Sequence, residues 1–103
     1  MRFGLRDDQI EEIVMVLRRF SDIESAKIFG SRARGDNKIA SDIDIVLYGQ
    51  LADSTAISVK AILEEETSLP YYFDVVDIQR LINERLKTEI ELQGQEFFSA
   101  NAA

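Results

Sequence analysis

The chain contains no cysteine, no histidine and no tryptophan, and it has a single proline. The absence of cysteine excludes disulfides and thiolate metal sites, which is typical of a protein of the reducing cytoplasm. Without histidine, acid–base chemistry must be done by carboxylates or left to metal-bound groups. Any metal site must use oxygen ligands, which favours magnesium or manganese over zinc.

Long apolar runs and excess basic charge are also missing. No run approaches the ~20 residues that span a bilayer, and charged residues interrupt the N-terminus where a signal peptide needs its apolar core. Lys and Arg number 12 against 19 Asp and Glu, so the net charge is −7. This balance disfavours direct nucleic-acid binding and is compatible with a basic protein partner. The 103 residues, 46% of them hydrophobic, predict one domain over 1–103 with a modest core.

Two aspartates stand inside an aliphatic segment. Asp42 and Asp44 alternate with Ile43, Ile45 and Leu47. A period of two predicts a strand with both carboxylates on one face and the aliphatic side chains on the other. Side chains at i and i+2 lie about 6.7 Å apart along a strand, so their oxygens can share a pair of metal ions. Without a cation the two carboxylates would repel each other.

A glycine–serine turn precedes this strand by ten residues. Residues Ser25 to Phe29 read as a short strand, and Gly30 then allows a sharp turn. Ser31 is placed as the N-cap of a short helical turn over 32–34, which Gly35 ends. Free N–H groups and a serine hydroxyl at a helix start form an anion cradle. A phosphate-binding turn beside a metal-binding strand predicts a site for a nucleoside triphosphate.

Either feature alone is weak, because a lone Gly-Ser is usually an ordinary turn and a lone Asp-x-Asp is often a solvated edge. Together they are specific: GSRARG followed by SDIDI resembles the signature of the polymerase-beta-type nucleotidyltransferases, Gly-Ser, ten residues, Asp-x-Asp. The small size resembles the minimal nucleotidyltransferases (MNT) of bacteria and archaea, usually the antitoxins of HEPN-domain ribonucleases. The family's third carboxylate is matched by Asp74 in FDVVD.

This resemblance implies an α+β nucleotidyltransferase fold, a small mixed β-sheet with helices packed mainly on one face. The residues expected to be catalytic and to bind two Mg²⁺ ions, with Mn²⁺ as the alternative, are Asp42, Asp44 and Asp74. Those expected to bind nucleotide are Gly30, Ser31 and Arg32. The implied reaction transfers AMP from ATP to a hydroxyl, most simply a tyrosine, of a HEPN toxin.

The implied partners are that toxin and ATP, with no nucleic acid and no membrane. A hetero-oligomer with the toxin is expected, and a homodimer is a second possibility. Two other functions stay open: a non-catalytic antitoxin that neutralises by binding, and a small-molecule nucleotidyltransferase of the aminoglycoside-modifying type. The latter enzymes carry an additional substrate-binding domain, for which 103 residues leave no room.

Hydrophobic spacing predicts the remaining elements. Helices are expected over 7–20, 53–66 and 79–98, the second capped by Asp53 and the last with a break near Asn83, and a strand is expected over 71–78. Residues 99–103 are expected to fray.

Several residues keep two interpretations. Arg32 is assigned to the nucleotide but could equally pair with an acid, and Arg34 is favoured as structural. Asp77 points opposite to the metal-binding face and is predicted to cap the helix that follows it. Tyr71 and Tyr72 could stack on a base, although packing is the commoner role of a strand aromatic.

Overall fold

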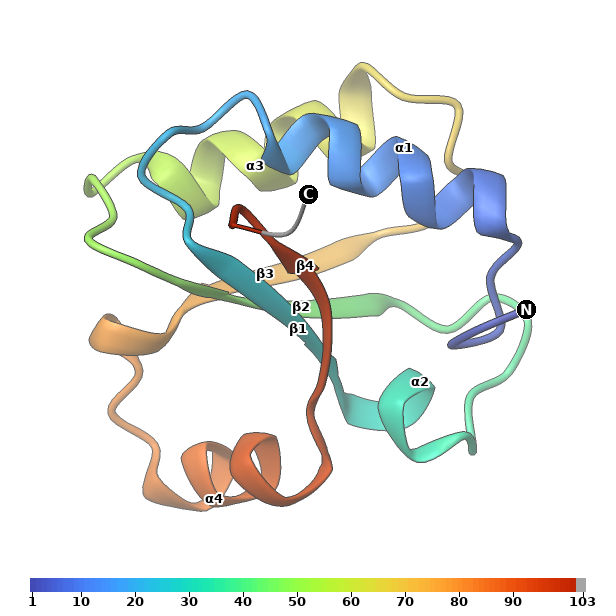
Figure 1. The fold of residues 1–103 in the computed structure, drawn as a ribbon. Helices are drawn as coiled ribbons and strands as arrows, with labels where there is room; N and C mark the ends of the chain where they lie inside the picture. The colour runs from blue at the N-terminus through green and yellow to red at the C-terminus, as the bar shows by residue number, and fades with distance from the viewer. Residues whose placement is uncertain (102–103) are drawn as a thin grey trace.

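A four-stranded mixed sheet forms the centre of the computed structural model, which describes residues 1–101 (Figure 1). The strands are β1 (Ser25–Phe29), β2 (Ile43–Tyr48), β3 (Phe73–Asp77) and β4 (Gln95–Ser99). They lie in the order β3-β2-β1-β4. Strand β1 is antiparallel to both of its neighbours, and β2 and β3 are parallel.

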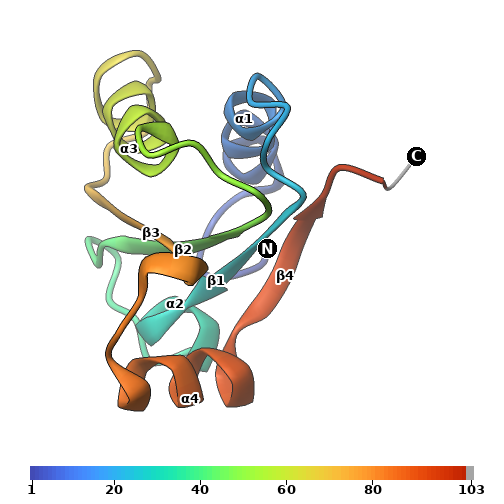
Figure 2. The same ribbon diagram turned by 90° about the vertical axis from the view of Figure 1, so that its left-hand side faces the viewer.

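Helices cover both faces of the sheet. The two longest, α1 (Asp7–Leu17) and α3 (Thr55–Glu65), lie side by side on one face (Figure 2). The short α2 (Gly30–Arg34), the 3₁₀ turn η1 (Ile78–Arg80) and α4 (Glu84–Gln93) follow the strands toward the other face. The predicted α+β class with a small mixed sheet is confirmed, and α4 adds a cover on the second face.

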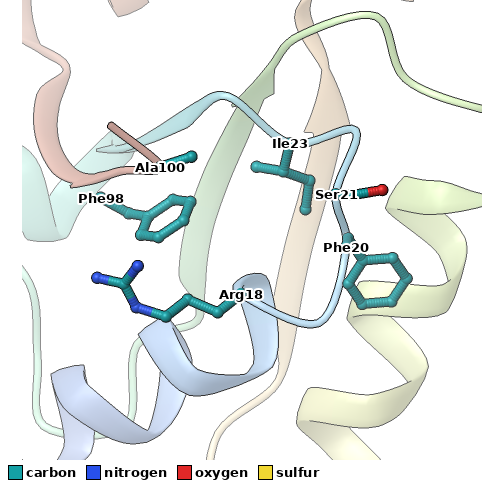
Figure 3. Close-up of a pocket in the computed structure, with 6 residues that line it drawn as sticks. All are labelled: Arg18, Phe20, Ser21, Ile23, Phe98 and Ala100. Atoms are coloured by element: carbon teal, nitrogen blue, oxygen red, sulfur yellow. The ribbon is translucent and has the colours of Figure 1, made fainter. Parts of the chain in front are cut away.

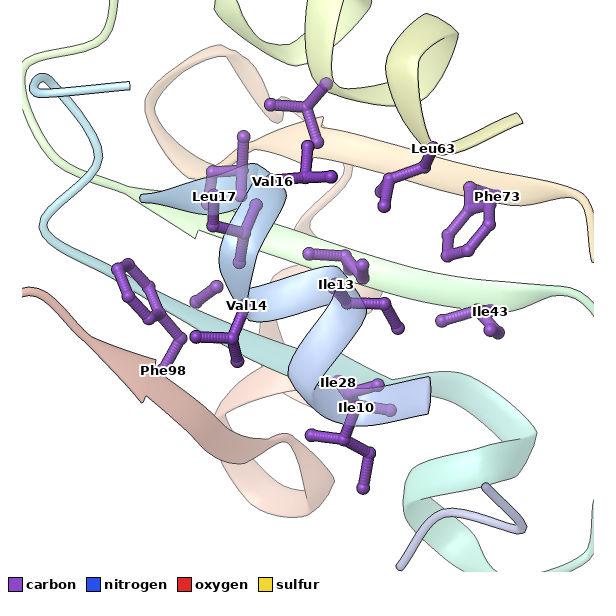
Figure 4. Packing of buried hydrophobic residues seen from close by; sticks show 14 of the residues in the cluster. Ile10, Ile13, Val14, Val16, Leu17, Ile28, Ile43, Leu63, Phe73 and Phe98 are labelled. Atoms are coloured by element: carbon purple, nitrogen blue, oxygen red, sulfur yellow. The ribbon is translucent and has the colours of Figure 1, made fainter. Parts of the chain in front are cut away.

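The period-two pattern of β2 decides which side chains enter which core. Ile43, Ile45 and Leu47 are fully buried in the larger core, between the sheet and helices α1 and α3 (Figure 4). Val46 points the other way, into a smaller core that also contains Phe29 and Ile90 of α4. Burying these aliphatic chains fixes the strand's register, because a slip by one residue would turn all of them to the wrong face.

The prediction of one helix over 79–98 is wrong at both ends. Its first part is the η1 turn, and Asn83 then caps α4 by accepting a hydrogen bond from the Leu86 N–H at 3.1 Å. The predicted break near Asn83 is therefore confirmed. After α4, residues 95–99 pair with β1 as an edge strand. The partners of this strand in β1 lie about seventy positions earlier in the chain. The spacing of apolar residues within 79–98 carries no information about such a distant pairing, so it predicted a helix.

Two smaller expectations are also corrected. Asp53 does not cap α3: the N-cap residue is Ser54, and the Asp53 carboxylate pairs with Arg80 instead. Ser99 does not fray, since it belongs to β4, and the Ala100 N–H donates to the Glu24 carbonyl at 2.8 Å. The rest of the predicted frayed segment includes 102–103, which lie outside the described residues. Within 1–101, none of the helices has the length and apolarity to cross a membrane.

Candidate functional site

Three aspartates lie near one another on the α4 face of the sheet, where β2 and β3 begin. Asp44 lies directly beside Asp74 in the parallel pairing of the two strands. Asp42 immediately precedes β2 and shares the orientation of Asp44, because Ile43 between them is buried in the core on the opposite face. This arrangement agrees with the predicted common face of Asp42 and Asp44, and Asp74 joins them on it.

The central carboxylate is the most perturbed. Partial burial and, after it, the negative charges of Asp74, Asp42 and Glu89 together raise the pKa of Asp44 from 3.8 to about 6, while the positive charge of Arg34 lowers it. Burial penalises the ionised form and like charges add to that penalty. The site therefore holds a carboxylate whose charge is poorly compensated by the protein itself.

The glycine–serine turn packs directly on this carboxylate. Gly30 has φ +71°, a left-handed conformation that side chains disfavour, and a Cβ at this position would lie 2.2 Å from Oδ2 of Asp44. Gly35, at φ +88°, ends α2, and its N–H donates to the Ser31 carbonyl at 2.9 Å. The turn and the Asp44 carboxylate are thus in contact only because residue 30 has no side chain.

Arg32 is oriented away from this site. It is 2% exposed, and its guanidinium donates to four backbone carbonyls, those of Phe3, Gly4, Ile39 and Ser41. Each of its three nitrogens has an acceptor, with distances of 2.8–3.4 Å. The prediction that Arg32 binds nucleotide is therefore not supported: its donors tie the N-terminal residues and the loop before β2 to α2.

Arg34, and not Arg32, is the arginine of α2 whose charge acts on the aspartate cluster. Its guanidinium is 3.1 Å from the Glu89 carboxylate of α4 and 3.2 Å from that of Asp36, and its charge acts on Asp44. The side chain is 34% exposed, so it can exchange partners. Glu89 was not singled out by the sequence, because it is 55 positions from Arg34 and belongs to no motif.

The two arginines provide a matched test of these assignments. Arg32→Ala is expected to lower the free energy of unfolding by about 3–5 kcal/mol, because one buried hydrogen bond and four partly buried ones to backbone carbonyls are lost together with the packing of a buried side chain. Arg34→Ala should cost less than about 1 kcal/mol, since it removes only partly exposed ion pairs. Urea denaturation of both variants measures the difference. Similar small losses in both would contradict the structural role of Arg32.

Burial differs among the residues for which the sequence left two interpretations. Tyr71 packs against the larger core with the Arg32 guanidinium 4.9 Å from its ring centre. Tyr72, on the other side of the strand, is 74% exposed. Asp77 is buried and accepts a hydrogen bond from the Gln79 N–H at 2.9 Å, which confirms the predicted capping role.

The three carboxylates are suitable ligands for a hard divalent cation, although their oxygen atoms are not close enough together to bind one as they stand. Within residues 1–101 no three carboxylates converge closely enough to form a ready-made ion site. Asp42 and Asp74 are exposed, however, and can rotate toward Asp44. A cation bound here would neutralise the charge of the Asp44 carboxylate, which the protein itself compensates poorly. The chemistry of the three oxygen donors therefore fits Mg²⁺ or Mn²⁺.

A separate hollow of about 260 Å³ lies at the opposite end of β1 (Figure 3). Its lining residues are Arg18, Phe20, Ser21, Ile23, Phe98 and Ala100. It contains no carboxylate and shares no residue with the aspartate cluster, so the chemistry belongs to the other end of the sheet.

A mixed sheet that presents paired aspartates to a Gly-Ser turn defines a nucleotidyltransferase-type site. The family model "Polymerase beta, Nucleotidyltransferase" matches residues 11–103. This chain belongs to that family of nucleotidyltransferases. Among curated proteins, no sequence gives a significant match.

Solved structures with a similar fold include several toxin–antitoxin complexes. A chain of a toxin–antitoxin with AMP-PNP superposes with a TM-score of 0.71 at 20% identity, covering 94% of this chain and 76% of that one. A chain from the tri-AMPylated Shewanella oneidensis HEPN toxin in complex with MNT antitoxin gives 0.70 at 19%, with coverages of 93% and 74%. A Sulfolobus solfataricus protein provisionally assigned as a nucleotidyltransferase gives 0.58 at 26%, with coverages of 93% and 82%.

Proposed function

We propose that this protein is a magnesium-dependent adenylyltransferase that modifies a HEPN-domain partner and thereby acts as its antitoxin. The observation that carries the proposal is the contact between the Gly30 turn and Asp44, with Asp74 beside it in register. This arrangement supports the proposal because the glycine–serine turn, which would bind phosphate, lies against paired carboxylates. The AMP-PNP and tri-AMPylated toxin complexes of similar fold support ATP as donor and a HEPN protein as acceptor.

Each part of the site has a role in this reaction. The Gly30–Ser31 turn would bind the triphosphate through backbone N–H groups and the serine hydroxyl, and Arg34 would add positive charge beside it. Asp42 and Asp44 would hold the metal against the triphosphate. Asp74, exposed on the edge strand, would complete a second metal position toward the acceptor. When bound, Mg²⁺ supplies neutralisation of phosphate charge and favours ionisation of a nearby hydroxyl.

The transfer itself is an in-line displacement. The acceptor hydroxyl oxygen forms a bond to the α-phosphorus, and the bond from that phosphorus to the bridging oxygen of the β-phosphate breaks. Pyrophosphate leaves, and the hydroxyl proton is released to solvent. Holding donor and acceptor in line on a rigid sheet edge supplies most of the rate acceleration.

The partner is proposed to be a protein rather than a nucleic acid or a membrane. A net charge of −7 favours association with a basic protein surface and opposes contact with phosphate backbones. We propose a hetero-oligomer with the HEPN toxin in the cytoplasm. A homodimer would be a distinguishable alternative in solution.

A labelling experiment tests the function. The protein is incubated with ATP labelled at the α-phosphate and the HEPN partner encoded beside it. We expect the label on a hydroxyl of the partner, most simply a tyrosine. Asp74→Asn should abolish labelling yet still bind the partner, because Asp74 is exposed and its loss leaves the core intact. Glu11→Gln, an exposed acid on α1, is the matched control and should label normally.

The outcomes separate the competing functions. Loss of labelling together with loss of protection in cells supports neutralisation by modification. Full protection by Asp74→Asn would favour an antitoxin that acts by binding alone. Label found only in small molecules would refute a protein acceptor.

A further inference from the structure

An exposed aromatic ring stands at the edge of the aspartate cluster. Tyr72 is 74% exposed, whereas its neighbour Tyr71 packs into the core on the opposite face. Tyr72 directly precedes β3, and extending the alternation of the strand by one residue places the Tyr72 side chain on the face that carries Asp74. Single exposed apolar residues are common on protein surfaces, so the position of this ring, and not its exposure alone, is the informative feature.

The backbone that carries this ring is held firmly against the site. The Tyr72 carbonyl accepts a hydrogen bond from the Ile43 N–H at 3.0 Å. Phe73 is paired with Ile43 in the parallel register, so Tyr72 lies beside Asp42 at the same end of the two strands. Neighbouring strands are about 4.8 Å apart. The backbone position of Tyr72 is therefore fixed next to Asp42 and close to Asp74.

Within residues 1–101, no other aromatic residue on this face has a strongly exposed ring. Phe29 is buried in the smaller core, and Tyr48 is partly buried there with the Lys27 ammonium 5.4 Å from its ring centre. In the part of the chain that the structure describes, Tyr72 is the one strongly exposed aromatic residue. Its surroundings are acidic, so a neutral planar group suits this position better than another anion.

We propose that the Tyr72 ring is the surface on which the nucleobase of the donor nucleotide stacks. The inference rests on the proposed use of a nucleoside triphosphate and adds a base-binding residue to it. With the triphosphate between the Gly30 turn and the aspartates, the base would extend along the start of β3. Stacking on an aromatic ring tolerates any base, because every base has a π-face. Tyr72 therefore increases affinity for the nucleotide without selecting adenine.

Steady-state kinetics with two variants test the ring against the hydroxyl. Tyr72→Phe keeps the ring and should leave KM for ATP within about twofold of the unmodified protein. Tyr72→Ala should raise KM about 10- to 100-fold with little change in kcat. Inhibition by inorganic tripolyphosphate, which has no base, should be the same in all three proteins. Ile57→Ala, a similarly exposed position on α3, is the control and should change nothing.

A binding measurement gives a readout that does not depend on transfer. The chain has no tryptophan, so Tyr72→Trp introduces a single fluorescent reporter. ATP should quench its emission by stacking, tripolyphosphate should not, and Ile57→Trp should respond to neither.

The two measurements separate this inference from the proposed function. Quenching by ATP in a protein that labels no partner would sustain the stacking role and overturn the transfer reaction. Normal labelling with an unchanged KM in Tyr72→Ala and no quenching would overturn the stacking role alone. Equal damage from Tyr72→Phe and Tyr72→Ala would assign the effect to the hydroxyl and also overturn it.

Discussion

Replacing Asp44 with asparagine is expected to reduce nucleotidyl transfer by about 10²–10³-fold or more while making the metal-free protein more stable. The activity falls because the variant loses the carboxylate charge at the centre of the site. The stability rises because the same charge is unfavourable in the folded state, where burial and neighbouring carboxylates raise the pKa of Asp44 to about 6. Asparagine keeps the shape of the side chain and removes that penalty.

The pH dependence of this gain has a definite sign. The folded-state pKa of Asp44 lies above the unfolded value, so the protonated form favours folding below about pH 4, and this contribution is lost as the pH rises through about 6. Asp44→Asn should therefore match the unmodified protein near pH 4 and exceed it at pH 8. The full shift would be worth ~3 kcal/mol, and the partial exposure of Asp44 reduces the expected gain to about 1–2 kcal/mol.

Urea denaturation with EDTA at the two pH values measures the gain, with Glu11→Gln as the control. Added Mg²⁺ and ATP should raise the Tm of the unmodified protein and have little effect on Asp44→Asn. A variant that is less stable than the unmodified protein at pH 8 would contradict the description of Asp44 as an unfavourable charge.

Gly30→Ala is the second substitution from which we expect a large effect, and Gly35→Ala is its matched control. Both glycines have positive φ, so each substitution carries a backbone cost of about 1–2 kcal/mol. Only at Gly30 does the new Cβ also meet a side chain, 2.2 Å from Asp44 Oδ2, while nothing lies within 4 Å at Gly35. Gly30→Ala should therefore lose most transfer activity, and Gly35→Ala should keep most of it.

Thermal denaturation and the labelling assay, run together on both variants, separate backbone strain from displacement of the carboxylate. The expected pattern is a loss of stability in both proteins and a loss of activity in one. Equal activity losses would mean that the turn, and not its contact with Asp44, limits the reaction.

Local patterns predicted the site wherever burial enforces them. The alternation around Asp44 was reliable because the aliphatic residues between the acids must enter the core, which leaves the carboxylates on the other face. The same rule accounts for Asp74, which follows the buried Phe73, and for the difference between Tyr71, which packs on the core, and the exposed Tyr72. The cap at Asp77 was equally local, since its partner is two residues away.

The features that sequence could not supply depend on distant segments. Residues 95–99 form a strand because they pair with the edge of β1. The periodicity of the segment itself contains no information about that edge. Arg32 and Arg34 are both long side chains on one short helix, and only the positions of distant carbonyls decided which one is buried. Glu89 lies near the aspartate cluster because α4 packs there, and no sequence motif in α4 predicts that position.

The hydrogen bonds of Arg32 also carry a consequence for handling this protein. One side chain joins the carbonyls of Phe3 and Gly4 to that of Ser41, the residue before Asp42. Residues Phe3 and Gly4 thus help to hold the loop that precedes Asp42. Deletion of these residues would therefore disturb the loop before Asp42, as a substitution within that loop would.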